Sequence, residues 1–477
     1  MEEDGEMKDT IIFYPSPGIG HLISMVELGK RFLQLNPPFS ITILITQASF
    51  NTGSTSPYIQ AVQSYFPSIS FHQLPPISFP LHSSSPHHEA LIFHLLRLNN
   101  PLVHQFLLPI ASSIRSLIFD FFCHPVLDLT APLHIPSYCF YTSPASTLAI
   151  FLYTPTIHRL NSASFKDLGD TLFHCPGVPP VPASDMPLPI QDREDDAYHD
   201  FLSTARAFPR ASGIIINTFE SLEPRAVEAL RSGACIPDGR TPPVYCIGPL
   251  TAEAEKREGG ADCLEWLDSQ PSRSVVFLCF GSLGVLSERQ LKEIAVGLER
   301  SGQRFLWVVR SPPSEDKSRR FLAPPEPDLV ALLPEGFLER TKGRGLVVKS
   351  WAPQVDVLSH DSVGGFVTHC GWNSVLEALC AGVPMVAWPL YAEQRQNRLV
   401  MVKEMRLALP VEEGQDGWVT AEEVERRVRE LTESEEGKGL RERTVEMKEE
   451  AMAAMTESGS SRVALAELAQ LWSCVKN

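Results

Sequence analysis

The chain has 477 residues, of which 43% are hydrophobic and 21% are charged, and its formal net charge is −16 at pH 7. At ~100–200 residues per domain, this length predicts two or three globular domains, each with a core of its own. The acidic balance and the lack of a basic stripe argue against binding to a phosphate backbone, so we expect no nucleic-acid partner.

The cysteines and the N-terminal residues indicate the cellular compartment of the protein. The 10 cysteines form no CxxC pair, and several lie in apolar runs, such as Cys139, Cys246 and Cys279. We therefore expect reduced, buried thiols in a cytoplasmic protein. Residues 1–10 are acidic and lack the regions of a signal peptide, and no apolar run reaches the ~18 residues that span a bilayer. We expect a monomer without membrane contact.

The first half of the chain alternates strand and helix patterns. Residues 11–14 predict a buried strand, which a Pro/Gly-rich turn at 15–20 separates from a helix-spaced apolar pattern at 22–33. Residues 41–46 predict the next strand, so this is a βαβ unit and the sheet is expected to be parallel. Further strands are predicted at 116–119, 136–141 and 213–217. Loops are expected at 75–90 and 175–190, where ligand contacts concentrate.

The second half repeats this pattern. Strands are predicted at 275–280, 305–309 and 346–349, and Ser287 with Gln290 and Thr420 with Glu423 predict two capped helix starts. Residues 311–328 predict a surface insert, residues 433–450 a solvated charged helix, and residues 461–472 a last helix. We therefore expect an α/β protein with two Rossmann-like β/α/β domains, at 1–248 and 271–455, joined by a linker at 249–270. Ligands in such sheets bind beyond the carboxyl ends of the strands.

Residues 351–394 carry the densest chemistry. β-like runs at 365–367 and 385–388 flank a helical segment at 372–381, and a helix N-terminus binds phosphate readily. Gly371 allows close approach of the backbone there. Trp351 offers a flat face for a base, and Glu377 can accept hydrogen bonds from both ribose hydroxyls. The remaining polar groups suit a phosphate or a sugar: His369, Asn373, Ser374, Glu393 and Gln394.

This stretch closely resembles the signature of plant secondary-product glycosyltransferases, the UDP-sugar-dependent family with the GT-B fold. The resemblance covers all of residues 351–394, and weaker similarity extends along almost the whole chain. It implies two Rossmann-like domains that face an interdomain cleft, and a C-terminal helix at 456–477 that packs back on the N-terminal domain. The whole chain resembles the branch that glycosylates flavonoids, chalcones and dihydrochalcones.

The resemblance also implies a role for each residue of the donor site. Trp351 stacks on uracil, the Ala352 backbone pairs with its edge, and Gln354 and Glu377 hold the ribose. The diphosphate contacts are His369, Gly371, Asn373 and Ser374. Ser282 follows a strand in a Gly-Ser turn, which by spacing alone is as readily a simple turn, but which the family uses against the diphosphate. The sugar contacts are Thr142, Trp372, Glu393 and Gln394, and the last of these, together with Trp372, resembles the glucose-using pattern.

His21 is the candidate general base. It lies after the first predicted strand at a helix start, which disfavours an imidazolium, so His21 should tend to stay neutral. A lone histidine is more often structural, but residues 18–21 (Gly-Ile-Gly-His) resemble the catalytic turn of the family, and Asp120 ends a strand that could lie adjacent. The resemblance implies that His21 deprotonates the acceptor and that Asp120 orients the ring. The family commonly has Pro at the position of Ser24, which puts the local helix start in doubt.

Two other site types compete with this interpretation. The spacing of Gly18 and Gly20 suggests a dinucleotide fingerprint, but the third glycine is replaced by Ile23, which removes the main support for a dehydrogenase. His82, His87, His88 and Glu89 could form a metal site, although we prefer a flexible loop on the acceptor side. We expect no metal and no cofactor beyond UDP-glucose as donor substrate, because the helix dipole and neighbouring donors can neutralise the leaving diphosphate.

We expect a single in-line displacement that inverts the anomeric carbon and gives a β-glucoside. The acceptor is expected to be a small aromatic molecule held by Phe119, Phe121, Phe122 and Met186. O-glucosylation is the preferred outcome, and C-glucosylation of a phloroglucinol-type acceptor needs the same base in a different pose. A UDP-sugar epimerase of the same fold and a non-catalytic binder remain as alternatives from other classes.

Overall fold

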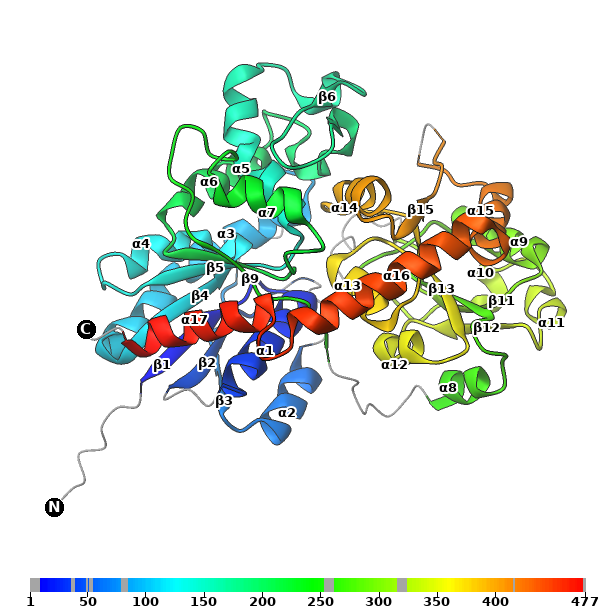
Figure 1. Ribbon diagram of the computed structural model, residues 1–477, viewed down its shortest axis with the longest axis horizontal. Coiled ribbons are helices and arrows are strands. Elements are labelled where there is room, and N and C mark those ends of the chain that lie inside the picture. The colour runs from blue at the N-terminus through cyan, green and yellow to red at the C-terminus, as the bar shows by residue number, and fades with distance from the viewer. Residues whose placement is uncertain are drawn as a thin grey trace. The chain divides into compact units, whose positions relative to one another are not determined.

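The computed structural model describes residues 9–35, 39–48, 50, 55–78, 85–252, 261–314, 324–414 and 417–474. The chain divides into two compact units. Unit 1 comprises residues 1–250 and 453–477, and unit 2 comprises residues 251–452. Figure 1 shows the first unit in blue to green with the red C-terminal helix, and the second in green to orange.

Unit 1 is built on a seven-stranded parallel sheet in the order β3-β2-β1-β4-β5-β8-β9. Every residue of β1 and β5 is buried, as expected for strands with helices on both faces. The strands are β1 (Thr10–Tyr14), β2 (Ser40–Ile45), β3 (Ile69–Gln73), β4 (Ile114–Asp120), β5 (Ser137–Tyr141), β8 (Gly213–Ile216) and β9 (Val244–Cys246). Two short strands, β6 (Leu172–Phe173) and β7 (Val181–Pro182), pair antiparallel outside this sheet.

The helices of unit 1 cover both faces of the sheet (Figure 1). They are α1 (Ile19–Leu33), α2 (Ser56–Tyr65), α3 (His88–Leu107), α4 (Leu127–Thr130), α5 (Ala145–Leu160), α6 (Asp196–Ala207), α7 (Pro224–Arg231) and α17 (Ser460–Cys474). The last of these comes from the far end of the chain. Its Trp472 is fully buried against Phe32, Phe39 and Tyr138, so α17 completes the core on the α1 face of the sheet.

Unit 2 repeats the design with a six-stranded parallel sheet in the order β12-β11-β10-β13-β14-β15. The strands are β10 (Val275–Cys279), β11 (Arg304–Val309), β12 (Gly345–Lys349), β13 (Val363–Thr368), β14 (Met385–Ala387) and β15 (Ala408–Pro410). The helices are α8 (Ala261–Asp268), α9 (Glu288–Ser301), α10 (Leu329–Leu332), α11 (Phe337–Arg340), α12 (Gln354–Ser359), α13 (Trp372–Ala381), α14 (Gln394–Val400), α15 (Ala421–Glu433) and α16 (Glu435–Ala454).

Both predicted helix caps of unit 2 are present. Ser287 accepts a hydrogen bond from the Gln290 amide at 3.2 Å, and Thr420 accepts one from the Glu423 amide at 3.3 Å. In a full capping box the side chain of Gln290 would bond back to the Ser287 amide. Here it donates to the Val419 carbonyl oxygen at 2.8 Å instead. Gln290 thereby ties the start of α9 to the residue before the α15 cap.

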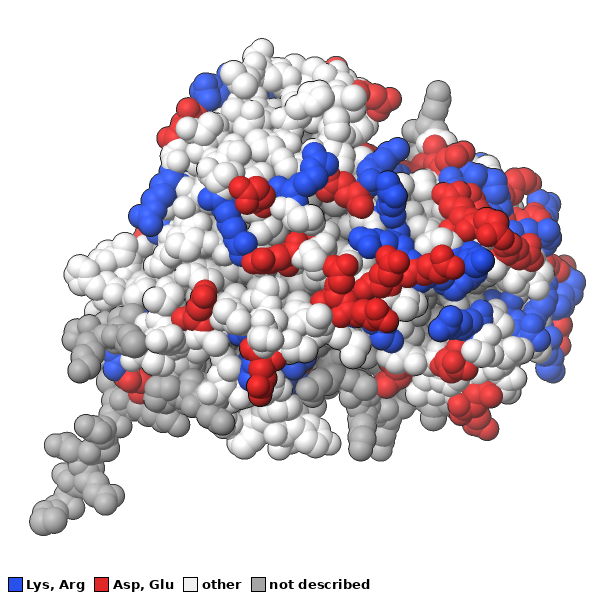
Figure 2. Space-filling view, in the orientation of Figure 1, with Lys and Arg blue, Asp and Glu red and all other residues white. Residues whose placement is uncertain are grey.

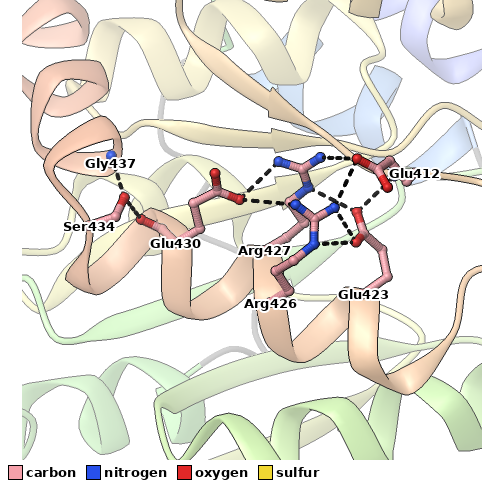
Figure 3. Close-up of polar contacts among 7 residues, drawn as sticks. All are labelled: Glu412, Glu423, Arg426, Arg427, Glu430, Ser434 and Gly437. Carbon is pink, nitrogen blue, oxygen red and sulfur yellow. Dashed lines mark hydrogen bonds and ion pairs between the residues drawn. The ribbon is translucent and has the colours of Figure 1, made fainter.

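Charged side chains of both signs lie over α15 and α16 (Figure 2). Helix α15, which precedes the expected solvated helix face at 433–450, carries a partly buried ion network (Figure 3). Arg427 lies at its centre and donates to Glu423 at 2.9 Å, to Glu430 at 2.9 Å and to Glu412 at 3.2 Å. Its side chain is only 7% exposed, so the network holds α15 against the segment after β15.

The observed boundaries of the units differ slightly from those in the predicted scheme. The division falls at Leu250 rather than residue 248, and the segment predicted as a linker, 249–270, contains helix α8. The return to unit 1 begins at Ala453, within the last turn of α16, where 456 was expected. None of the helices in the described ranges is both long and apolar enough to cross a membrane.

Candidate functional site

Each sheet has one point where the strand order reverses, and the predicted site residues gather there. In unit 1 this point lies between β1 and β4, since the chain runs outward from β1 through β2 to β3 and then returns to β4. Ligands of open parallel sheets bind beyond the carboxyl ends of the strands at such a point. His21 follows β1 and Asp120 ends β4, so the topology alone brings these two residues together.

His21 and Asp120 form a hydrogen-bonded pair. The distance between His21 Nδ1 and Asp120 Oδ2 is 2.9 Å, and the Asp120 side chain is fully buried while that of His21 is 31% exposed. An ionised carboxylate only accepts hydrogen bonds, so this contact favours the tautomer with the proton on Nδ1 and the lone pair on Nε2. This is the form in which His21 can accept a proton from a bound hydroxyl group.

Ser16 is a member of this arrangement that the sequence did not point to. Its hydroxyl donates to the second carboxylate oxygen of Asp120, Oδ1, at 2.5 Å, and lies 3.8 Å from the Cys123 sulfur. Both oxygens of Asp120 therefore have a partner, which holds the carboxylate in one orientation. The Pro-Ser-Pro turn at 15–17 places Ser16 there, but a turn serine alone predicts no such contact.

Aromatic side chains surround the pair. The Phe122 ring meets the His21 ring edge-on, with centroids 5.9 Å apart, and Phe121 contacts Phe122, Phe151 and Phe201. Phe122 thus lies beside the candidate base, whereas Phe121 is buried among the other aromatic rings. Thr142 follows β5, the strand next to β4, and so lies at the same edge of the sheet.

Two of the predicted acceptor-binding residues lie in the core instead. Phe119 is fully buried and packs against Phe208, because both faces of β4 are covered by helices. Met186 is 1% exposed, and its carbonyl oxygen accepts a hydrogen bond from Gln191 Nε2 at 2.7 Å. Neither side chain offers a surface to a ligand in this ligand-free structure.

The reversal point of unit 2 lies between β10 and β13, and it brings together Ser282 and His369. Ser282 is exposed in the turn after β10, and His369 follows β13. The His369 ring lies between two glycines. A Cβ atom on Gly281 would come within 2.5 Å of His369 Nε2, and one on Gly371 would collide with the same atom. The glycines therefore make room for the imidazole, as well as allowing backbone approach.

Burial fixes the charge of His369. It lowers the pKa of His369 to about 4, so the imidazole is neutral at pH 7. Its Nδ1 is buried and has no hydrogen-bond partner in the described structure. In the ligand-free protein His369 therefore presents a neutral imidazole, which can form a hydrogen bond.

The N-terminus of α13 is the predicted phosphate site, and its geometry matches that role. Gly371 is the N-cap residue and makes no side-chain cap, so the positive end of the helix dipole of α13 is not capped by a side chain of that residue. Cys370, just before it, has a positive φ of 66°, which is unusual for a residue other than glycine. Asn397 of α14 donates to the Cys370 carbonyl oxygen at 2.9 Å and to Glu393 Oε1 at 3.3 Å. Sequence reasoning missed Asn397, which lies three residues beyond the motif.

The predicted ribose contacts form a connected group. Gln354 Nε2 donates to Ser374 Oγ at 2.9 Å and to Glu377 Oε2 at 2.7 Å. Burial raises the pKa of Glu377 to about 7, although the hydrogen bond from Gln354 lowers it. Hydroxyl donors from a ligand would stabilise the charged form of this carboxylate.

Trp351 comes three residues before Gln354, and 40% of the residue is exposed. Ser350, in the turn between β12 and Trp351, has a positive φ of 62° and donates its amide to the Val309 carbonyl oxygen at 2.7 Å. This turn directs the chain out of the sheet, and Ala352 is buried directly after it. An exposed indole next to a buried backbone suits stacking on a base and pairing with its edge.

The predicted sugar contacts of unit 2 are more deeply placed. Trp372 is 3% exposed and Gln394 is 2% exposed. Gln394 Oε1 accepts hydrogen bonds from the Leu390 and Tyr391 amides at 2.9 and 3.0 Å, so its oxygen shapes the preceding loop. Glu393 is the N-cap residue of α14.

The histidine cluster of unit 1 does not form a metal site in the described residues. His87 lies 4.0 Å from Asp195, while the His88 ring packs against Phe50 and His88 begins α3, where a loop was expected. His82 lies outside the described residues. Within the ranges that the structure describes, no group of three or more His, Cys, Asp or Glu side chains is placed to hold a metal ion.

Known proteins resemble this chain over nearly its whole length. The model of the family "UDP-glucoronosyl and UDP-glucosyl transferase" matches residues 234–435. An anthocyanidin 5,3-O-glucosyltransferase from a Rosa hybrid cultivar is 50% identical over 97% of this chain and 99% of its own length. A phloretin 2'-O-glucosyltransferase from Pyrus communis is 52% identical over 95% of this chain and 98% of its own. The structure of Phytolacca americana UGT2 complexed with UDP-2fluoro-glucose and pterostilbene superposes with a TM-score of 0.87, at 39% identity and with 98% and 100% of the two chains covered.

Proposed function

The chain belongs to the family of UDP-glucuronosyl and UDP-glucosyl transferases, and from this we propose that it transfers glucose from UDP-glucose to a hydroxyl group of a small phenolic molecule. It is a UDP-glycosyltransferase, and its two parallel-sheet units are those of the GT-B fold. The relatives named for anthocyanidin and phloretin favour a flavonoid or dihydrochalcone acceptor.

The observation that carries the proposal of transfer, rather than simple binding, is the pair of His21 and Asp120. A nucleotide-binding protein needs no oriented imidazole beside an aromatic surface. Here the 2.9 Å contact to a buried carboxylate holds the ring, and Phe122 packs beside it. The pair has the geometry of a general base with its orienting acid.

In the proposed reaction the acceptor hydroxyl gives its proton to His21 Nε2, and Asp120 stabilises the resulting imidazolium. The acceptor oxygen forms a bond to the anomeric carbon of glucose, and the bond between this carbon and the β-phosphate oxygen breaks. UDP leaves with the electron pair of that bond, and its added charge is stabilised at the N-terminus of α13. One displacement inverts the anomeric centre, so the product is a β-glucoside.

We further propose that the donor is bound without a metal ion, as a complex of one chain with UDP-sugar and acceptor. Acidic and basic side chains alternate on the face drawn in Figure 2, which suits neither a nucleic-acid backbone nor an anionic membrane surface. The reducing cytoplasm suits the nine described cysteines with free thiols, most of which are buried.

The test is to incubate the protein with UDP-glucose alone and with added phloretin, and to analyse both mixtures by chromatography and mass spectrometry. We expect a phloretin glucoside and UDP only in the second mixture, and no product from the variant His21→Ala. Isomerised UDP-sugar in the first mixture would indicate an epimerase, and no product in either would indicate a binder; each result would overturn the proposal. Acid hydrolysis of the glucoside separates an O-linkage, which is cleaved, from a C-linkage, which resists.

A further inference from the structure

Arg310 lies among the strand ends that form the donor site of unit 2, yet no predicted role includes it. It directly follows β11, whose neighbours in the sheet are β10 and β12. Ser282 follows β10 and Trp351 follows β12, so Arg310 lies between the predicted diphosphate contact and the predicted base contact. It also lines a small cavity together with Phe280 and Gly281 of the turn after β10.

The guanidinium of Arg310 is partly buried but has no partner. Its Nε atom is buried without a hydrogen-bond acceptor, and within the described residues Arg310 forms no hydrogen bond or ion pair. Several other arginines of this unit are paired with carboxylates; Arg340, for example, lies 2.6 Å from Glu299. Removing a cation from water without a compensating anion is costly, so an unpaired guanidinium in a pocket is a sign of a ligand contact.

The groups that face Arg310 do not supply this anion. Cys279 and Tyr391 are its electrostatic neighbours. Burial raises the pKa of Cys279 to about 11 and raises that of Tyr391 above its usual range, so both are neutral at pH 7. Arginine itself stays protonated in proteins, even where burial lowers its pKa as it does here.

The predicted donor site otherwise has no positive charge. Its ionisable members are Glu377, Glu393 and His369, and the last of these is neutral at pH 7 because burial lowers its pKa to about 4. Lys349, at the end of β12, is exposed and lies 2.9 Å from Glu326. A diphosphate carries negative charge in the donor and more in the leaving group, and a guanidinium is the side chain best suited to bind it.

We propose that Arg310 is the cation of the donor site and binds the diphosphate of the UDP-sugar. The proposal rests on the function proposed above, because it deepens the description of the same site. Arg310 then contacts only the phosphate groups, so it contributes to the binding of UDP and not to that of uridine. The same contact stabilises UDP as it departs. The helix N-terminus and Ser282 then supply neutral donors, while Arg310 supplies the charge.

The test compares Arg310→Met and Arg310→Lys with the wild type by calorimetric titration with UDP and with uridine. Lys349→Met is the matched control, since it removes a positive charge from the same edge of the sheet without touching the site. We expect Arg310→Met to weaken UDP binding by about 10- to 100-fold, the range for a charge-assisted contact, and to leave uridine binding unchanged. Arg310→Lys should retain part of the UDP affinity, and Lys349→Met should match the wild type.

Thermal unfolding of the ligand-free variants separates this role from a structural one. Because the guanidinium has no partner in the folded protein, Arg310→Met should not lower the unfolding temperature and can raise it. An equal loss of uridine and UDP affinity, or no loss of either, would overturn the proposal while leaving the transferase function intact. If the wild type itself failed to bind UDP, the proposed function would fail together with the role of Arg310.

Discussion

His21 Nδ1 lies 2.9 Å from Asp120 Oδ2, while the other oxygen of the same carboxylate accepts a hydrogen bond from Ser16 at 2.5 Å. The carboxylate is fully buried and the imidazole is not. Ser16 therefore fixes the orientation of the Asp120 carboxylate, and the carboxylate in turn fixes the orientation of the His21 ring. The tautomer of His21, and with it the basicity of Nε2, depends on Asp120 remaining an acceptor.

The variant Asp120→Asn keeps the shape of the side chain but can turn an amide donor towards His21. The ring would then accept at Nδ1 and carry its proton on Nε2, where the base must have its lone pair. We expect kcat to fall by about 10²- to 10⁴-fold with little change in the KM for UDP-glucose. Initial rates with phloretin as acceptor measure this.

The control for this variant is Asp128→Asn. Asp128 lies on α4 of the same unit, and its exposed carboxylate pairs with Arg210 at 2.6 Å. Its substitution should leave kcat within about twofold, since exposed ion pairs contribute little. Equal rates for Asp120→Asn and the wild type would remove Asp120 from the proposed mechanism.

The raised pKa of Glu377 predicts that both the stability of the protein and its affinity for UDP depend on pH. Burial raises its pKa to about 7 in the folded protein from 4.5, so the folded state binds a proton more tightly than the unfolded state. Its contribution to stability is therefore complete below pH 4.5 and is lost as the pH rises to about 7. Glu377→Gln should flatten this decline in denaturant unfolding measured between pH 5 and pH 8.

The same carboxylate should release a proton when UDP binds. Ribose hydroxyls donate to the charged form and so lower the pKa of Glu377 in the complex. UDP affinity should therefore fall as the pH drops below 7, and titrations at pH 6 in buffers of different ionisation enthalpy should reveal proton release. Glu377→Gln should bind UDP more weakly and release no proton; unchanged proton release in this variant would assign the effect to another group.

Helix α13 shows how far the sequence could predict the donor site. The segment was predicted at 372–381 and is observed at those residues, because its apolar spacing lies between Gly371 and Gly382, which end the helix on both sides. The parallel sheets were also predictable, since strands and helices alternate in both halves. Local signals of this kind need no knowledge of tertiary contacts.

Contacts between distant segments could not be predicted in this way. Phe119 ends an apolar strand, and only the helices on both faces of the sheet decide that it is core rather than pocket. The segment 249–270 has the composition of a linker, yet α8 forms within it. Arg427 looks like any charge on an amphipathic helix, and its burial depends on the approach of Glu412 from the end of β15.

Arg427 is expected to be a large contributor to the stability of unit 2 (Figure 3). Arg427→Met removes the common cationic partner of three glutamates. Glu423, which is 9% exposed, then keeps only Arg426 as a cation and the Glu412 amide as a neutral donor. Breaking a buried ion pair from one side costs about 3–5 kcal/mol. Arg429→Met is the control, because Arg429 is half exposed and its pair with Glu425 should be worth less than about 1 kcal/mol. Equal losses in denaturant unfolding would contradict the role of the network.

Asn397 is predicted to couple the phosphate loop to the sugar contact. Its amide nitrogen joins the carbonyl oxygen of Cys370, whose φ of 66° needs support, to the carboxylate of Glu393. Asn397→Ala should remove both contacts, destabilise the protein by about 1–3 kcal/mol and raise the KM for UDP-glucose, while the KM for the acceptor is unchanged. Asn397→Asp should be worse than alanine, because it places a carboxylate beside a carbonyl oxygen and Glu393. Initial rates at saturating acceptor measure the KM for UDP-glucose of the wild type and both variants. A loss of stability without a change in this KM would show that Asn397 has a purely structural role.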